Sequence, residues 1–193
     1  NTQNATYYLF YADRGDSDID DLWELFVTAL AYSENSTSEN KDHFSRYFDK
    51  VINRKNNGNA KITMGLYWIA PNSFLNLDSR NRWYIYESGK LPLELVYKLP
   101  RIHSKISASD YFSIVNSLKN YLDSPQSELK NFKELSFEAW KYSEQVNKEE
   151  QAKKEVSESS APTYNLASED TKEFEKGDTS YAREDFLKEV FVS

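Results

Sequence analysis

A short polar stretch that interrupts segment 61–86, the densest apolar and aromatic run of the chain, carries the residues best suited to chemistry. Arg80 and Arg82 have guanidinium groups that can bind a phosphate through two parallel hydrogen bonds. Trp83, next to them, offers a ring on which an exposed base can stack. These residues predict a nucleic-acid contact. The structural alternative is that Asp78 pairs with one arginine to hold a turn while the rings fill the core.

The charge around this stretch is locally basic, although the net charge of the whole chain is −7. Segment 144–193 holds 13 acidic and 7 basic residues, so the rest of the chain is nearly neutral. Segment 79–105 holds six Lys or Arg against two Glu. We therefore add Arg101 and Lys105 to the predicted nucleic-acid contacts, although a solvated loop accounts for the same charges.

The residue sets of common catalytic sites are missing. Without cysteine there is no disulfide framework and no thiolate metal site. His43 and His103 are far apart in the sequence, and five isolated glycines do not form a phosphate-binding loop. Glu128 and Lys130 match a fragment of a nuclease pattern, but they flank a proline-containing loop instead of adjacent strands. We predict no enzyme activity, no catalytic residue, no metal site and no cofactor in this chain.

The chain has no apolar run close to the ~20 residues of a membrane span, and its first residues lack the apolar core of a secretion signal. With the absence of cysteine, this predicts a cytoplasmic protein without a membrane partner.

Two amphipathic helices are expected before segment 61–86. The first is capped by Ser17 or Asp18, with acidic residues in its first turn. Its apolar stripe is Ile19, Leu22, Trp23, Phe26 and Leu30. The stripe of the second is Phe44, Tyr47, Phe48, Val51 and Ile52. Residues 56–58, Asn-Asn-Gly, predict a left-handed end to the second helix.

Within segment 61–86, periodicity leaves 61–70 undecided between helix and strand. Pro71 must break the chain at Ala70, and we expect a short helix from Pro71 to Leu77. Residues 83–86 are expected to be extended, and segment 91–99 stays ambiguous.

A further helix should begin at Ser107, which forms a capping pair with Asp110. Its apolar stripe is Tyr111, Ile114, Val115, Leu118 and Leu122. Asp123, Ser124 and Pro125 should end it. A later helix, capped by Ser136, would place Phe137 and Trp140 as the last large apolar anchors.

The predicted fold is mainly α: one helical domain over residues 1–146 with at most a short strand or hairpin, and α+β as the alternative. Residues 7–11, Tyr-Tyr-Leu-Phe-Tyr, are compatible with a strand. Residues 147–180 have almost nothing to bury, which predicts a charged linker that is helical at its start. Residues 181–193 predict a fresh capped helix that leads into a further module. The abrupt start of the chain also points to a piece of a larger protein.

The stretch GLYWIAPNSFLNLDSRNRWYI resembles a segment of McrB-like restriction proteins, which are AAA+ NTPases of modification-dependent restriction systems. In this chain the matching residues are Tyr67, Trp68, Ile69, Pro71, Phe74, Leu75, Asn76, Leu77, Asp78, Ser79, Asn81 and Arg82. The ending YAREDFLKEVFVS is similar to the lead-in to the AAA+ core of that family. The two matches cover about twenty and thirteen residues and stand in the order expected.

This resemblance implies a non-catalytic region between a DNA-specificity module and the motor. It implies three partners: DNA bearing modified bases, an AAA+ module in the same chain, and an McrC-like nuclease subunit. The family's GTP- or ATP-binding motifs are absent here, so NTP hydrolysis would belong to the parent protein. The leading interpretation is therefore that this region contributes to DNA recognition or couples it to the motor. The alternative is a protein-interaction or spacer domain that does not contact DNA.

Overall fold

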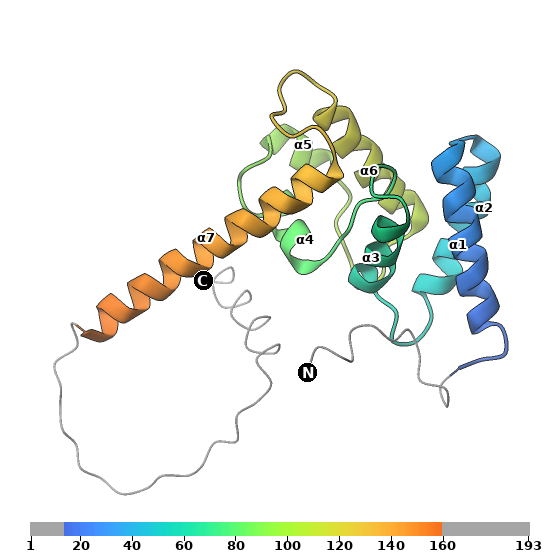
Figure 1. The fold of residues 1–193 in the computed structure, drawn as a ribbon, viewed down its shortest axis with the longest axis horizontal. Coiled ribbons are helices and arrows are strands. Elements are labelled where there is room, and N and C mark those ends of the chain that lie inside the picture. The colour runs from blue at the N-terminus through green and yellow to red at the C-terminus, as the bar shows by residue number, and fades with distance from the viewer. Residues whose placement is uncertain (1–13, 160–193) are drawn as a thin grey trace, which may run out of the picture. The chain divides into compact units, whose positions relative to one another are not determined.

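The computed structural model describes residues 14–159, with side chains to residue 154, and this part of the chain is helical without a strand (Figure 1), which confirms the predicted mainly α fold. The helices are α1 (Asp18–Glu34), α2 (Ser38–Ile52), α3 (Asn59–Ile69), α4 (Ser79–Tyr86), α5 (Leu93–Lys98), α6 (Ala108–Leu122) and α7 (Phe132–Ser159). The described residues 14–154 belong to one compact unit, and residues 155–159 belong to a second. The predicted strand at residues 7–11 and the predicted helix over 181–193 lie outside the described residues.

Helices α1 and α2 form a hairpin. The Thr37 hydroxyl caps α2 by accepting a hydrogen bond from the Asn40 amide at 3.2 Å. The Asn40 side chain donates to the carbonyls of Ala31 and Asn35, which fastens the turn to the end of α1. The α2 stripe packs as predicted, and Phe44, Phe48, Val51 and Ile52 are buried. Asn56 has a φ of 63°, so the left-handed residue lies four positions beyond the end of α2.

The predicted apolar stripe of α1 is only partly correct. The buried face of this helix consists of Asp18, Asp21, Leu25 and Ala29. Ile19 and Trp23 are 42% and 62% exposed. Periodicity identifies an apolar stripe, but it does not say how wide the neighbouring surface is. Here α2 covers only one side of the stripe, so the other side faces solvent.

Residues 61–69 are helical, as part of α3, and the helix ends at Ile69, with Ala70 as its C-cap, so the chain breaks at Ala70 before Pro71 as expected. The predicted helix from Pro71 to Leu77 is wrong: a turn follows Pro71, and residues 74–77 are buried without helical structure. Side chains satisfy their backbone instead. The Thr63 hydroxyl accepts a hydrogen bond from the Leu77 amide at 2.8 Å, and the Tyr111 hydroxyl binds both backbone groups of Leu75. Buried backbone groups need such partners outside regular structure.

Residues 83–86 belong to α4, so the predicted extended piece is also wrong. The Asp78 carboxylate caps this helix by accepting a hydrogen bond from the Asn81 amide at 2.8 Å. The Asn76 amide group donates to the other Asp78 oxygen at 2.9 Å. The cap overrides the strand preference of an aromatic run. It also replaces the predicted pairing of Asp78 with an arginine.

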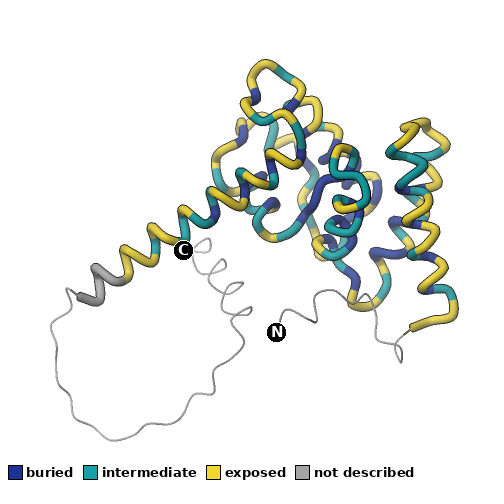
Figure 2. Tube along the Cα trace, viewed as in Figure 1, coloured by how far each residue is buried: buried dark blue, intermediate teal, exposed yellow. Residues whose placement is uncertain are grey.

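Aromatic side chains are among the largest fully buried residues of the unit. The buried stretches of the backbone are dark blue in Figure 2. Phe44 stacks on Phe74 with ring centroids 5.1 Å apart, and Phe48 stacks on Tyr111 at the same separation. Phe112 meets Phe44 edge-on at 5.3 Å. These contacts join α2, α6 and segment 74–77 in one core.

Helix α6 is capped by Ser107, and its whole predicted stripe is buried. Helix α7 begins at Phe132, after Asn131, whose side chain accepts hydrogen bonds from the amides of Lys133 and Glu134. Ser136 therefore lies inside the helix and is not its cap. The helix continues beyond residue 146, so residues 147–159 are helical.

Phe137 and Trp140 are 62% and 47% exposed, so the prediction that they anchor this helix is wrong. Phe132, Leu135 and Ala139 are buried in their place. Side chains three and four residues apart lie on one face of a helix, and the face of Ala139 is the one that meets the body.

Candidate functional site

Arg80, the first of the five predicted nucleic-acid contacts, forms an ion pair within the fold. Its guanidinium nitrogen lies 2.6 Å from the Glu144 carboxylate, which joins the first turn of α4 to α7. Nearby, the Asn81 side chain donates a hydrogen bond to the Ser136 hydroxyl at 3.2 Å. Both bonds link the same two helices, so Arg80 contributes to the position of α7.

Trp83 is half-buried between α4 and α7. Its ring stacks on Tyr142 with centroids 5.4 Å apart and an interplanar angle of 22°. The Lys90 ammonium lies 4.2 Å from the centroid of the Tyr142 ring, a cation–π contact. One face of the Trp83 indole is therefore covered by Tyr142.

Lys105 lies in the segment between α5 and α6, which other elements hold in place. The Asn59 side chain donates to the His103 carbonyl at 2.6 Å and accepts from the Ile106 amide at 2.9 Å. The Lys105 ammonium donates to the Arg54 carbonyl at 2.8 Å, beyond the end of α2. This lysine thus acts as a cap for a carbonyl after α2 and is half-buried.

Arg82 and Arg101 are exposed, and neither forms an ion pair within the described part of the chain. Tyr86, at the end of α4, donates a hydrogen bond to the Pro100 carbonyl at 2.8 Å, which brings the α4 end next to Arg101. Three of the five predicted residues therefore serve contacts within the fold, and two remain available on the surface.

A charged cluster that the sequence reasoning missed joins α1 to the end of α2. Asp21 accepts from Lys50 at 2.6 Å and from Arg54 at 2.8 Å. Arg54 Nε also lies 2.9 Å from Asp18 Oδ1, although this pair lacks hydrogen-bond geometry. Burial opposes ionisation of Asp21, but the bonds from Lys50 and Arg54 outweigh it and lower the pKa of this carboxyl. The acidic first turn of α1 was the available signal, but its partners lie 29 and 33 residues away.

The two negative and two positive charges of this cluster neutralise each other, so the cluster holds α1 to the end of α2 and does not resemble a metal site. Among the described residues, no group of three His, Cys, Asp or Glu can hold a metal ion. The two histidines, His43 and His103, are both exposed. Lys130, from the fragment that matched a nuclease pattern, donates a hydrogen bond to the Ser127 carbonyl at 2.5 Å. In the same part of the chain, every helix is too short or too polar to cross a lipid bilayer.

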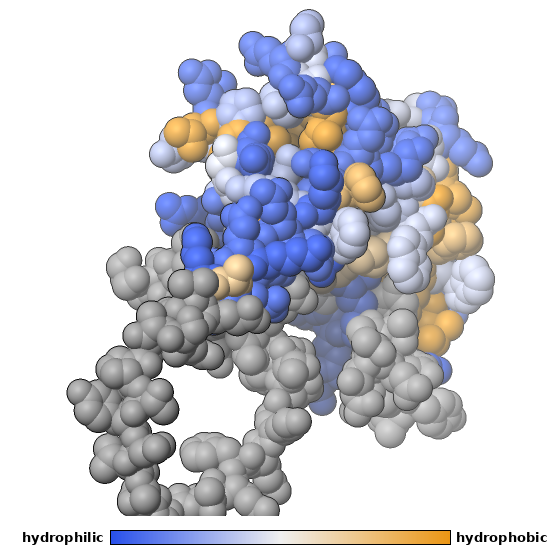
Figure 3. All heavy atoms as spheres, turned by 60° about the vertical axis from the view of Figure 1, so that its left-hand side comes forward, coloured by the Kyte–Doolittle hydropathy of each residue, from blue (hydrophilic) through white to orange (hydrophobic). Residues whose placement is uncertain are grey.

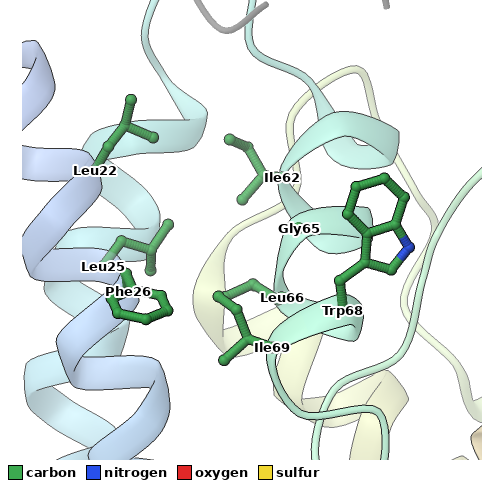
Figure 4. Close-up of a pocket in the computed structure, with 8 residues that line it drawn as sticks. All are labelled: Leu22, Leu25, Phe26, Ile62, Gly65, Leu66, Trp68 and Ile69. Carbon is green, nitrogen blue, oxygen red and sulfur yellow. The ribbon is translucent and has the colours of Figure 1, made fainter. Parts of the chain in front are cut away.

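An apolar groove of about 520 Å³ lies between α1 and α3 (Figure 4). We call it the α1–α3 groove, lined by Leu22, Leu25 and Phe26 of α1 and by Ile62, Trp68 and Ile69 of α3. Trp68 is 73% exposed, and Trp23 packs edge-on against Phe26 with centroids 5.6 Å apart. Another view shows apolar side chains gathered in patches on a mostly hydrophilic face (Figure 3).

The fold and these sites define an all-helical domain whose described residues carry an apolar groove and an anchored helix. The chain belongs to the family described as "Domain of unknown function (DUF8425)", whose model matches residues 1–142. Neither the curated proteins nor the solved structures contain a match. The matched region ends at Tyr142, the α7 residue that stacks on Trp83.

Proposed function

We propose that this helical domain is a non-catalytic interaction and spacer domain of an McrB-like restriction NTPase. In this role α7 carries the AAA+ module of the same chain at a fixed position relative to the domain. The resemblance of segment 65–85 to McrB-like proteins supports the proposal that the domain belongs to such an NTPase. The resemblance of residues 181–193 to the lead-in of the AAA+ core supports the proposal that an AAA+ module follows α7. An McrC-like nuclease subunit would be the partner of the assembled motor.

The observation that carries this proposal is the attachment of α7 to α4. Three described residues of α7 make contacts with α4. Tyr142 stacks on Trp83, and Glu144 forms an ion pair with Arg80. Ser136, six residues before Tyr142, accepts a hydrogen bond from Asn81. An ion pair that is about one-third exposed adds little stability by itself. Together with the aromatic stack, however, it fixes both the position and the rotation of the helix.

Beyond this attachment, α7 continues as one helix to Ser159, and Figure 1 shows its turns up to residue 154, within the first unit, standing clear of the other helices. Its 28 residues span about 42 Å at 1.5 Å per residue. A short charged helix in isolation is marginally stable, because nucleation is unfavourable. Here the docked first half supplies the nucleus, and the Gln145 amide adds a bond to Glu149 one turn on. An arm of this kind suits a spacer.

The test is a helix break placed just beyond the attachment. Asn147→Pro costs about 3 kcal/mol of helix stability within α7, and the matched Asn147→Ala is a good helix former at the same position. In the complete restriction complex, we expect Asn147→Pro to lower NTP-driven DNA cleavage at least tenfold, while the melting temperature of the domain stays the same. Full cleavage activity with Asn147→Pro would overturn the spacer role.

DNA contact is the second candidate, and the exposed pair Arg82 and Arg101 favours it. If these arginines bind phosphates, the full chain will bind duplex or single-stranded DNA with an affinity that falls steeply with salt. Each of Arg82→Gln and Arg101→Gln would then reduce the salt slope by about 1. Arg80→Gln is the matched comparison, because it removes an arginine that is occupied by Glu144. Fluorescence anisotropy without salt-dependent binding would eliminate this candidate.

A further inference from the structure

The α1–α3 groove is an apolar surface without a charged lining residue. Every side chain that lines it is aliphatic or aromatic, apart from Gly65, which leaves the middle of α3 without a side chain. An open apolar groove flanked by exposed tryptophans marks a binding surface. The ligand that matches it is an uncharged peptide segment rich in aromatic and aliphatic side chains.

We infer that the α1–α3 groove binds residues 7–11 of this same chain, the stretch Tyr-Tyr-Leu-Phe-Tyr. These residues are the most apolar stretch outside the described part of the chain, and they carry no charge. The charged residues Asp13 and Arg14 follow it closely, so the apolar stretch is short. A short apolar stretch suits a groove of limited length. This inference goes beyond the proposed spacer role and does not depend on it.

The length of the connection allows this docking. Residues 15–18 form a turn, in which the Asp18 amide donates to the Gly15 carbonyl and the Gly15 amide donates to the Asp18 carboxylate. Three residues therefore connect Tyr11 to this turn, and they can span up to about 14 Å when extended. The groove residue farthest along α1, Phe26, lies about 12 Å from Asp18 along the helix axis. The segment can therefore turn back and reach any point of the groove.

The dimensions of segment and groove also agree. The α3 side of the groove runs from Ile62 to Ile69, about 10 Å along the helix. Five extended residues span about 16 Å, with alternate side chains on opposite sides. Two or three aromatic side chains would thus enter the groove and the others would cover its rim.

The family match favours this segment over the second apolar segment outside the described residues. The match covers residues 1–142, so it includes residues 7–11 and ends before residues 181–193. The groove itself also lies within the matched region. A groove and its occupant that belong to the same domain are the simplest arrangement. The terminal segment and a second copy of the chain remain as the occupants to be excluded by experiment.

Paramagnetic labelling tests the docking directly, because the full chain has no cysteine and a single engineered one is the only labelling site. Ala12→Cys places a nitroxide next to the segment without altering it. We expect the amide signals of Ile62, Gly65 and Ile69 to be broadened, independently of protein concentration. The matched label at Ala182→Cys, beside the terminal segment, should leave these signals sharp.

Three outcomes would overturn the inference: no broadening from Ala12→Cys, broadening from Ala182→Cys alone, or broadening seen only between different molecules. The last is detected by mixing isotope-labelled chains with separate nitroxide-labelled chains, and it would identify a second copy as the occupant. A further variant pair checks the contact. Leu9→Ser with Phe10→Ser should abolish the broadening, and Val190→Ser with Phe191→Ser should preserve it. Persistence of the broadening in the first pair would also count against the inference.

Discussion

The hydroxyl of Tyr111 binds both backbone groups of Leu75: it accepts from the amide at 3.0 Å and donates to the carbonyl at 2.9 Å. Both residues are fully buried. The bonds connect α6 to the non-helical segment 74–77, which lies within the stretch that resembles McrB-like proteins. Thr63 and Asp78 also hold the same segment, because Thr63 accepts from the Leu77 amide and Asp78 accepts from the Asn76 side chain. Many residues of that sequence motif therefore form the non-helical connection between α3 and α4.

Tyr111→Phe is expected to destabilise the domain by about 2–6 kcal/mol. The substitution preserves the ring packing but leaves a buried amide and a buried carbonyl without partners, at about 1–3 kcal/mol each. Tyr121→Phe, at a half-buried position on the same helix, is the matched control and should change stability by less than about 0.5 kcal/mol. Urea unfolding followed by circular dichroism measures both. Equal stability of the two variants would contradict the role given to the hydroxyl.

Asp21→Asn is expected to lower stability by about 1–2 kcal/mol at pH 7, because it removes charge-assisted bonds to two cations. The pKa of Asp21 is lower in the folded state than in the unfolded state. Its contribution is therefore present above the unfolded pKa of about 4 and disappears as pH falls through the folded pKa. The difference from the wild type should thus shrink below pH 4. Asp20→Asn, at the exposed neighbouring position, should change stability at pH 7 by less than about 0.5 kcal/mol.

Tyr84→Phe tests stability at alkaline pH. Burial, followed by the negative charge of Glu138, raises the pKa of Tyr84 to about 12. Above pH 10 the unfolded chain loses this proton while the folded chain retains it, so folding becomes less favourable as pH rises. At pH 11 the free energy of unfolding of the wild type should therefore fall by about 1 kcal/mol more than that of Tyr84→Phe. Tyr97→Phe, at an exposed position, is the control, and an equal loss in both variants would count against this account.

Tyr142→Ala should detach α7 from α4. It removes the stack on Trp83 and the ring beneath Lys90, and we expect a loss of about 1–3 kcal/mol at this half-buried site. Limited proteolysis should then cleave within 142–154 faster than in the wild type. Gln151→Ala, at an exposed position further along α7, should leave the cleavage rate unchanged. Identical digestion of the two variants would argue against an anchored helix.

Local patterns in the sequence predict much of the fold. The Ser107 cap and the spacing of the α6 stripe give that helix correctly, because both signals lie within one element. The α2 stripe is correct for the same reason. The cap at Asp78 was also encoded locally, in an acid followed by the amide of Asn81. The aromatic run at 83–86 hid it, since such runs favour strands.

The candidate site depended on contacts that local patterns do not contain. Arg80 and Glu144 are 64 residues apart, and Lys105 and Arg54 are 51 residues apart. Before the fold is known, an arginine beside a tryptophan fits a phosphate and a carboxylate equally well. The exposure of Trp23 and Phe137 was missed because the extent of the neighbouring helices, and not the stripe itself, decides which apolar residues are buried.

The fixed position of α7 is the central claim, and a distance measurement between two spin labels tests it most directly. In this cysteine-free chain, Asn116→Cys on α6 and Lys153→Cys on α7 provide two exposed labelling sites. Double electron–electron resonance should give one narrow distance distribution, and adding Tyr142→Ala should broaden it. A broad distribution in the chain that retains Tyr142 would contradict the claim that α7 is a rigid arm.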